Sequence, residues 1–212
     1  MGVLYEICVA LQRGSANIVG AKTQEALDAG IAPEKILNEG LLTGMAIIGR
    51  KFKVNEVYVP DVLIAARAMH AGLNILKPRL AERGVEPIGK VVLGTVKGDL
   101  HDIGKNLVGM MMIGAGLEVI DVGIDVSEDK FIQAVKEHHP AVLALSALLT
   151  TTMSEQKNVI EALKAAGIRE KVKVMVGGAP VTDDFAKQIG ADAYTPDAAS
   201  AAEVAKQFAL VK

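Results

Sequence analysis

The sequence contains few aromatic residues, no tryptophan and a single cysteine. Three tyrosines and four phenylalanines are present among 212 residues, although half of the chain is hydrophobic. Aliphatic side chains and methionine must therefore fill any core. Cys8 cannot form an internal disulfide, and its place on an apolar helical face predicts a core position.

Strong net charge and long apolar runs are also missing. The formal net charge is −2, and no Lys/Arg cluster suggests a surface for nucleic acid. Uncharged stretches such as residues 141–152 are too short, and too polar at one end, to span a bilayer. The N-terminal residues lack the charged start and apolar core of a signal peptide. We therefore expect a soluble, cytoplasmic protein.

Apolar residues recur at helical spacing through the first 86 residues. The pattern predicts helices beginning near residues 3, 15, 32 and 59, with Gly14 and Gly30 between them and Lys77-Pro78 ending the last. Four helices joined by short connections predict a four-helix bundle over residues 1–87.

The period changes from helical to strand-like near residues 84–89, and helices and strands alternate from there on. Near-continuous apolar strands alternating with helices predict a parallel sheet covered on both faces. We therefore expect a second domain, 88–212, with an α/β, doubly wound, flavodoxin-like (Rossmann-like) fold and five strands in the order 2-1-3-4-5. The expected strands are 90–96, 117–124, 141–147, 172–177 and 193–195, and the expected helices are 104–115, 127–138, 153–166, 182–189 and 198–210.

Polar residues and glycines gather where these predicted strands end. Asp99 and His101 follow the first strand, hydroxyl residues 146–152 follow the third, and Gly177-Gly178 ends the fourth. Ligands of open α/β sheets bind at the carboxyl ends of the strands, near the switch point between the first and third. Threonines also cap helices and paired glycines also make turns, but their convergence beside one loop histidine favours a ligand site.

His101 admits two interpretations. A neutral imidazole whose other ring nitrogen faces a carboxylate is a good metal ligand, whereas an Asp/His loop can also merely cap a helix. His138 and His139 precede the third strand, at the opposite edge of the sheet. A five- or six-residue strand spans roughly 17–20 Å, which argues against a zinc site shared with His101. We expect His70 to be structural.

Three motifs carry a resemblance to a known family. Asp99-x-His101-x-x-Gly104, Ser146-x-Leu148 and Gly177-Gly178 together resemble the cobalamin-binding domain of the base-off, histidine-on type. Residues 40–45, 49–52 and 58–63 resemble the helical cap of corrinoid proteins of anaerobic methyltransferase systems and of cobalamin-dependent methionine synthase. The resemblance covers nearly the whole chain.

The resemblance implies roles for the residues at the sheet edge. His101 would replace the cofactor's own dimethylbenzimidazole as the lower axial ligand of cobalt, and Asp99 would accept a hydrogen bond from its other ring nitrogen. Thr152 stands where the methionine synthase pattern has serine, which keeps the hydroxyl of the relay His101–Asp99–Thr152. A released imidazole nitrogen could take a proton, with the carboxylate stabilising the charge. Further implied cofactor contacts are Gly98, Leu100, Asp102, Gly104, Ser146, Leu148, Thr150, Gly177, Gly178 and Ala198, with Met69, Tyr58 and Phe52 in the cap.

The resemblance also implies a function. The chain would be a corrinoid methyl carrier of one-carbon metabolism, cycling between Co(I) and methyl-Co(III), and not catalytically self-sufficient. Its implied partners are a donor methyltransferase, an acceptor methyltransferase using tetrahydrofolate or a thiol such as coenzyme M, and a reductive activase. The sequence leaves the donor open among methanol, methylamines, methoxylated aromatics and betaines.

Three alternatives remain at this stage. The cobalamin subunit of a radical mutase shares the motifs, but radical mutases place a barrel over the corrin where this chain has predicted helices. A cobalamin-dependent sensor would need a DNA-binding module, and no basic recognition helix is visible. A flavodoxin-like domain without corrinoid would fail to bind cobalamin.

Overall fold

A computed structural model describes residues 2–211 of the chain. The described chain divides into two compact units. A helical unit contains the residues up to Pro87 together with Gly114–Gly116, and an α/β unit contains Ile88–Ile113 and the residues from Leu117 onward. None of the helices within residues 2–211 has the length and apolar character needed to cross a membrane.

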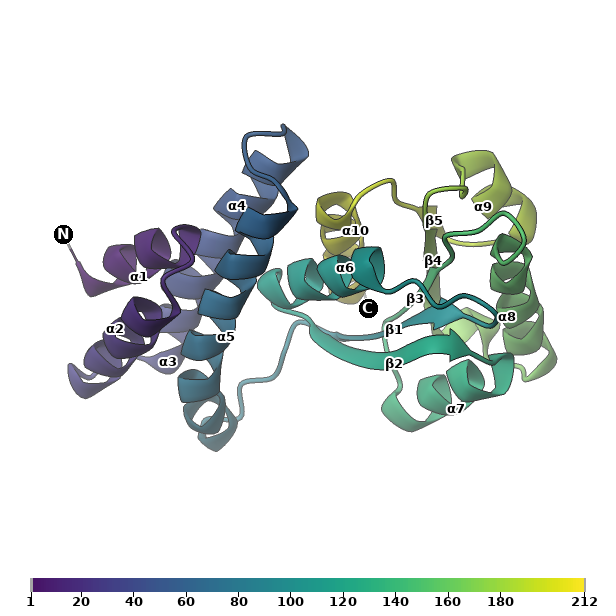
Figure 1. The fold of residues 1–212 in the computed structure, drawn as a ribbon. Helices are drawn as coiled ribbons and strands as arrows, with labels where there is room; N and C mark the ends of the chain where they lie inside the picture. Colours follow the sequence, from purple (N-terminus) through teal and green to yellow (C-terminus); the bar gives the residue numbers. More distant parts are fainter. Residues whose placement is uncertain (1, 212) are drawn as a thin grey trace. The chain divides into compact units, whose positions relative to one another are not determined.

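The helical unit contains the four helices that the sequence predicts, the third of them interrupted (Figure 1). That third helix contains a π-helical segment between two α-helical ones, without a break in the chain. Apolar side chains of every long helix are buried, among them Leu11, Val19, Met45 and Leu76. The elements are α1 (Val3–Gln12), α2 (Ala16–Asp28), α3 (Pro33–Lys35), the π-helix (Ile36–Leu42), α4 (Thr43–Lys53) and α5 (Val59–Glu82).

The expected end of α5 at Lys77-Pro78 is wrong, because the helix continues to Glu82 with Pro78 inside it. A proline within a helix removes one backbone hydrogen bond and crowds the preceding turn. Leu80, beyond the proline, is nevertheless buried. Burial of a leucine side chain is worth about 1.5–3 kcal/mol, which is enough to offset much of the proline's effect and hold the last turn.

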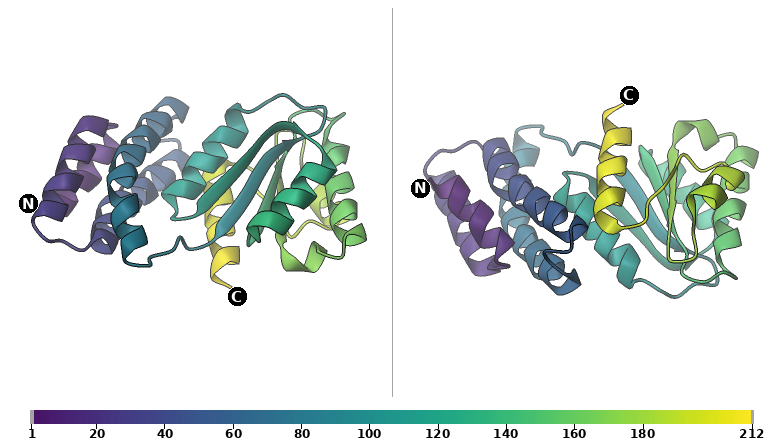
Figure 2. Two further views of the ribbon diagram at one scale, coloured as in Figure 1. Left: turned by 90° about the horizontal axis from the view of Figure 1, so that it is seen from below. Right: turned by 90° about the horizontal axis from the view of Figure 1, so that it is seen from above.

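The α/β unit has the predicted five-stranded sheet, with order β2-β1-β3-β4-β5 and every neighbouring pair parallel. Helices α6 and α10 cover one face, and α7, α8 and α9 cover the other (Figure 2). The strands are β1 (Lys90–Val96), β2 (Glu118–Val126), β3 (Val142–Ser146), β4 (Lys173–Gly177) and β5 (Ala193–Tyr194). The helices are α6 (Ile103–Gly114), α7 (Glu128–His138), α8 (Met153–Ala165), a short 3-10 turn (Arg169–Lys171), α9 (Asp183–Ile189) and α10 (Ala198–Leu210).

The two faces of the sheet are packed in different ways. Phe131, Ile160 and Leu163, from the helices of one face, are fully buried in one cluster with the apolar side chains of the strands. On the other face α6 approaches closely, because a Cβ added at Gly109 would lie 3.1 Å from Leu93 Cδ2. The buried side chains of α10 are all alanine. On this face glycine and alanine let the helices lie close to the sheet, so that the core can be filled with few aromatic side chains.

Strand β2 is irregular at its carboxyl end. From Leu93 to Val96 strand β1 advances by three residues, whereas β2 advances by five from Asp121 to Val126. The strand runs two residues past its predicted end at residue 124, and Asp125 has a left-handed backbone with φ of 50°. Such β-bulges bend a strand and redirect its side chains.

Candidate functional site

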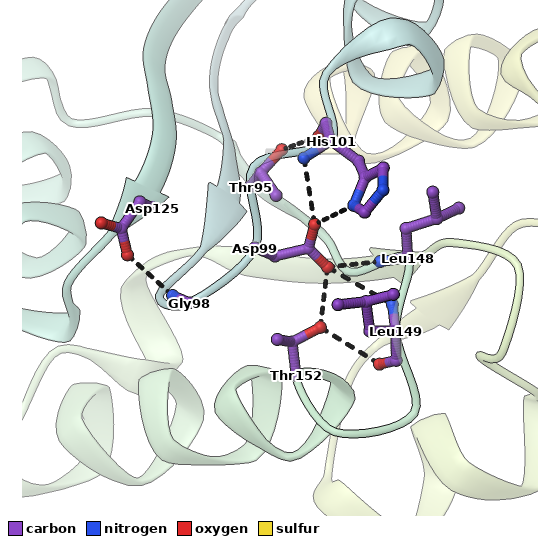
Figure 3. A network of polar contacts seen from close by, with 8 residues as sticks. All are labelled: Thr95, Gly98, Asp99, His101, Asp125, Leu148, Leu149 and Thr152. Atoms are coloured by element: carbon purple, nitrogen blue, oxygen red, sulfur yellow. Dashed lines mark hydrogen bonds and ion pairs between the residues drawn. The ribbon is translucent and has the colours of Figure 1, made fainter.

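The loop between β1 and α6 carries a buried aspartate and a half-exposed histidine. The Asp99 side chain is fully buried, and the His101 side chain is 50% exposed. Nδ1 of His101 lies 2.7 Å from Asp99 Oδ1, and the backbone N–H of His101 donates to the same oxygen at 3.1 Å (Figure 3). These contacts orient the ring, and Nε2 has no hydrogen-bond partner among residues 2–211.

The second oxygen of Asp99 connects this loop to the chain that follows β3. Asp99 Oδ2 accepts from the backbone N–H of Leu148 and from Thr152 Oγ1, both at 2.7 Å (Figure 3). Thr152 is buried at the start of α8. Because β1 and β3 are neighbours and parallel, their ends bring together residues 53 positions apart. The structure therefore places His101, Asp99 and Thr152 in one hydrogen-bonded chain.

Asp99 is a carboxylate at neutral pH. Burial raises the pKa of Asp99, but hydrogen bonds donated by Thr152, Leu148 and His101 together hold that pKa well below its ordinary value. An ionised carboxylate can only accept, so in the contact between Asp99 Oδ1 and His101 Nδ1 the ring nitrogen is the donor. In a neutral ring with Nδ1 protonated, the lone pair is on Nε2, the nitrogen available to a metal.

Exposed apolar side chains lie close in sequence to this histidine and in the loop after β3 that meets it. Leu100 is 68% exposed and Ile103 is 78% exposed, both within two residues of His101. Leu148 and Leu149 in the loop after β3 are about two-fifths exposed, and the backbone N–H of Leu148 donates to Asp99, the residue that orients the imidazole (Figure 3). A free imidazole nitrogen among exposed leucine and isoleucine side chains fits a metal held in a large apolar macrocycle. The residues present therefore fit a corrinoid.

The glycines of the predicted motifs have different surroundings. A Cβ added at Gly104 would meet nothing within 4 Å, which leaves open space beside the histidine loop. At Gly178, where φ is 127°, a Cβ would lie 1.8 Å from the carbonyl oxygen of Ala147. At Gly177 it would lie 3.3 Å from the carbonyl oxygen of Thr195. Gly177 and Gly178 thus allow the loops that follow the strands to lie close together.

The remaining predicted contact residues are distributed over both units. Ser146 ends β3 half-buried, Thr150 is exposed in the following turn, and Ala198 is buried at the start of α10. Gly98 and Asp102 are exposed in the histidine loop. In the helical unit Tyr58 is 66% exposed, Phe52 is half-buried, and Met69, at 1% exposed, offers almost no surface to a ligand.

Sequence reasoning missed three polar residues at this edge. Thr95 is fully buried at the end of β1, and its Oγ1 donates to the carbonyl oxygen of His101 at 2.9 Å. Asp125 accepts from the backbone N–H of Gly98. Gln156 is fully buried, and its Nε2 donates at 3.1 Å to two carbonyl oxygens, that of Leu145, the next-to-last residue of β3, and that of Gly177, the last residue of β4. The sequence could have indicated Thr95 and Gln156, because each is a polar residue in an otherwise apolar, buried pattern. Nothing in the sequence around Asp125 indicates its role.

Comparison with known proteins agrees with this chemistry. Two family models, both described as B12 binding domain, match residues 3–77 and 89–205. A corrinoid protein of Desulfitobacterium hafniense is 41% identical over 211 residues, 98% of each chain. Trimethylamine corrinoid protein 1 of Methanosarcina acetivorans is 47% identical over 173 residues, 81% of this chain and 80% of the relative.

A solved structure extends the likeness to the fold. The methanol:cobalamin methyltransferase complex MtaBC from Methanosarcina barkeri contains a chain that matches with a TM-score of 0.90 and 31% identity. The match covers 99% of this chain and 80% of that one. Fold and site thus define a B12-binding protein. The chain belongs to the family of corrinoid proteins of methyltransferase systems, which confirms the resemblance stated from its motifs.

Proposed function

We propose that this chain carries methyl groups on a bound corrinoid between a donor methyltransferase and an acceptor methyltransferase. The observation that supports the proposal most is the hydrogen-bonded chain His101–Asp99–Thr152, which leaves Nε2 of His101 free at the carboxyl edge of the sheet. The relatives named for trimethylamine and methanol systems support the methyl-transfer role.

Within this proposal, the corrinoid binds base-off and histidine-on. His101 would hold the cobalt through Nε2, and Asp99 fixes the ring and its tautomer through Nδ1. Thr152 and the backbone N–H of Leu148 hold the carboxylate in place. When bound, the cobalt supplies both the nucleophile that accepts the methyl group and the bond that carries it. Whenever Nε2 is free it can take a proton, and the carboxylate of Asp99 stabilises the resulting imidazolium.

We assign the other contacts by their position. Leu100, Ile103 and Leu148 offer an apolar surface for the corrin ring, whereas the displaced nucleotide tail needs the smaller and hydroxyl-bearing residues. The proposal includes a helical cap domain of residues 1–87, to which Tyr58 belongs, and a cobalamin-binding domain of residues 88–212. The residues proposed for the tail and its entrance are Gly98, Asp102, Gly104, Ser146, Thr150, Gly177, Gly178 and Ala198.

The proposal requires three protein partners. A donor methyltransferase loads the methyl group, and an acceptor methyltransferase passes it to tetrahydrofolate or to a thiol. A reductive activase restores the cobalt after accidental oxidation. The relatives include proteins named for trimethylamine and for methanol, so both kinds of donor are candidates.

A single-turnover assay tests the proposal. The full chain, loaded with cobalamin and reduced to Co(I), is mixed in turn with methanol, a methylamine, a methoxylated aromatic and a betaine, each with its matching methyltransferase, and the cobalt spectrum is followed. We expect methylation with at least one donor, a rate lowered at least about tenfold by His101→Ala through lost ligation, and no change in the control His138→Ala. Protein purified from its host with an adenosyl upper ligand, and no methylation by any donor, would instead indicate the radical mutase subunit.

A further inference from the structure

We infer that Asp125, on the irregular end of β2, is a positioning residue that holds the loop carrying His101 in its ligating position. The inference rests on the proposed role of His101 as the axial ligand. It adds a residue that lies outside the His101–Asp99–Thr152 chain and outside the family motifs named above.

Asp125 is joined to the loop at two adjacent points. Its Oδ1 accepts from the backbone N–H of Gly98 at 2.7 Å (Figure 3). Its own backbone N–H donates to the carbonyl oxygen of Asp99 at 3.0 Å. Asp125 therefore fixes the peptide groups on both sides of the Gly98–Asp99 bond, and Asp99 in turn orients the ring of His101.

The backbone at Asp125 adopts an uncommon conformation to make these contacts. Its φ of 50° lies in the left-handed region, which non-glycine residues rarely occupy. The conformation falls where β2 contains two more residues than the matching stretch of β1. Bulges of this kind are found beside functional sites, where they redirect a side chain. Here the redirected group is the carboxylate that reaches Gly98.

The same strand also holds the chain that follows the histidine. Lys105, four residues after His101, is only 4% exposed and forms an ion pair with Asp121 of β2. Asp121 Oδ1 also accepts from the backbone N–H of Gly123 at 2.9 Å, within the bulged stretch. Strand β2 thus contacts the loop region before His101 through Asp125 and after it through Asp121. A loop fixed on both sides keeps its imidazole in place without help from a ligand.

Two substitutions separate the hydrogen bond from the backbone conformation. Asparagine and glycine both tolerate a left-handed backbone, but only asparagine keeps an acceptor oxygen at the same place. Asp125→Asn is therefore the matched control for Asp125→Gly. The first readout uses the protein without cofactor: hydrogen exchange of the Gly98 amide, measured by NMR. We expect exchange about tenfold faster in Asp125→Gly and within about twofold of wild type in Asp125→Asn.

The second readout uses the protein loaded with cobalamin and reduced to Co(II). Nitrogen splitting in the electron paramagnetic resonance spectrum, with ¹⁵N-histidine in the protein, gives the fraction of cobalt ligated by protein imidazole. We expect the ratio of ligated to unligated cobalt to fall about tenfold in Asp125→Gly and to be retained in Asp125→Asn. The hydrogen-exchange experiment has its own internal control, the amide of Val174 on β4, which should exchange at the wild-type rate in both variants.

The outcomes separate the inference from the proposed function. Histidine-derived splitting in wild type that is unchanged in Asp125→Gly overturns the role of Asp125. So does exchange that rises equally at Gly98 and Val174, which would show general destabilisation only. Wild-type protein without histidine-derived splitting overturns the proposed axial ligation, whatever the exchange at Gly98.

Discussion

The helical unit and the α/β unit bury different kinds of side chain. Within residues 2–211 the helical unit buries one polar side chain, that of Thr23, whereas the α/β unit buries six. Among residues 2–211 the buried Oγ1 of Thr23 has no hydrogen-bond partner, and neither do Oε2 of Glu34 and Oε1 of Gln156. The hydroxyls of Thr95 and Thr152, in contrast, both donate hydrogen bonds to the histidine loop. Burying polar groups is unfavourable unless they are paired. Their concentration at one sheet edge therefore marks a site held by polar contacts, whereas the helical unit is held by apolar packing. The six are Thr95, Asp99, Lys105, Thr152, Gln156 and Thr195.

We expect the largest difference between the two units when one methyl group is added at a glycine of each unit and the loss in the free energy of unfolding is compared. In Gly178→Ala the new Cβ would meet the backbone of Ala147, at a φ that L-residues avoid, so nothing flexible can move aside. We expect a loss of about 4 kcal/mol or more in the free energy of unfolding. In Gly72→Ala the methyl would meet side-chain atoms of Leu41 and Val19 in a regular helix, and we expect about 1 kcal/mol. Urea denaturation measures both, and equal losses would contradict the comparison.

Two aspartates with lowered pKa values provide the next comparison. Asp99 is buried and has five hydrogen-bond donors at the carboxyl edge, whereas Asp192 accepts from Val174 N–H and Arg169 at the opposite edge and remains partly exposed. We expect Asp99→Ala to lower the free energy of unfolding by about 3 kcal/mol, because it leaves buried donors unpaired. Asp192→Ala should lose about 1 kcal/mol, since solvent screens its pairs. A larger loss for Asp192→Ala would show that the histidine loop is not held by Asp99.

The pH dependence of stability should report the bond between Thr152 and Asp99. The pKa of Asp99 is lower in the folded than in the unfolded protein, so its contribution is present above about pH 4 and is lost as the pH falls further. Thr152→Val removes one donor and raises that pKa. We expect a loss of about 1 kcal/mol at neutral pH and a shallower decline below pH 4, with Thr152→Ser close to wild type. Identical acid-unfolding curves for the two variants would remove Thr152 from the network.

We expect the smallest difference in stability between substitutions of two fully buried threonines, Thr95 and Thr23. Thr95→Val leaves the carbonyl oxygen of His101 without its donor and should cost about 1 kcal/mol. Thr23→Val replaces a hydroxyl that has no partner, so we expect no loss and a gain of up to about 1 kcal/mol. Thermal unfolding of the two variants measures the difference. A cost at Thr23 equal to that at Thr95 would mean that the helical unit also depends on polar pairing.

The positions of the helices and strands could be predicted from the sequence, because they follow from local apolar periodicity. The sequence also predicted that the residues following β1 and β3 meet at one edge of the sheet. Apolar periodicity gave the helices and strands to within a few residues, apart from Pro78 in α5. The strand order alone placed Asp99, His101 and the hydroxyl residues 146–152 at one edge of the sheet, and the resemblance to the methionine synthase pattern singled out Thr152 among them.

Contacts that depend on tertiary register could not be predicted. Asp125 reaches Gly98 only because β2 is bulged, and no local pattern distinguishes that bulge from a strand ending at residue 124. The π-helical segment Ile36–Leu42 has an ordinary helical pattern. The close approach of Gly178 to the carbonyl oxygen of Ala147 is a contact between two loops that only the folded sheet brings together.

The most direct test of the account is the origin of the nitrogen bound to cobalt. Protein with ¹⁵N-labelled histidine is loaded with unlabelled cobalamin, reduced to Co(II) and examined by electron paramagnetic resonance. Ligation by His101 predicts that the three-line splitting from ¹⁴N becomes a two-line splitting from ¹⁵N, and that His101→Ala abolishes it. Three-line splitting that persists in the labelled protein would mean that the cofactor's own base remains bound, and would contradict the account.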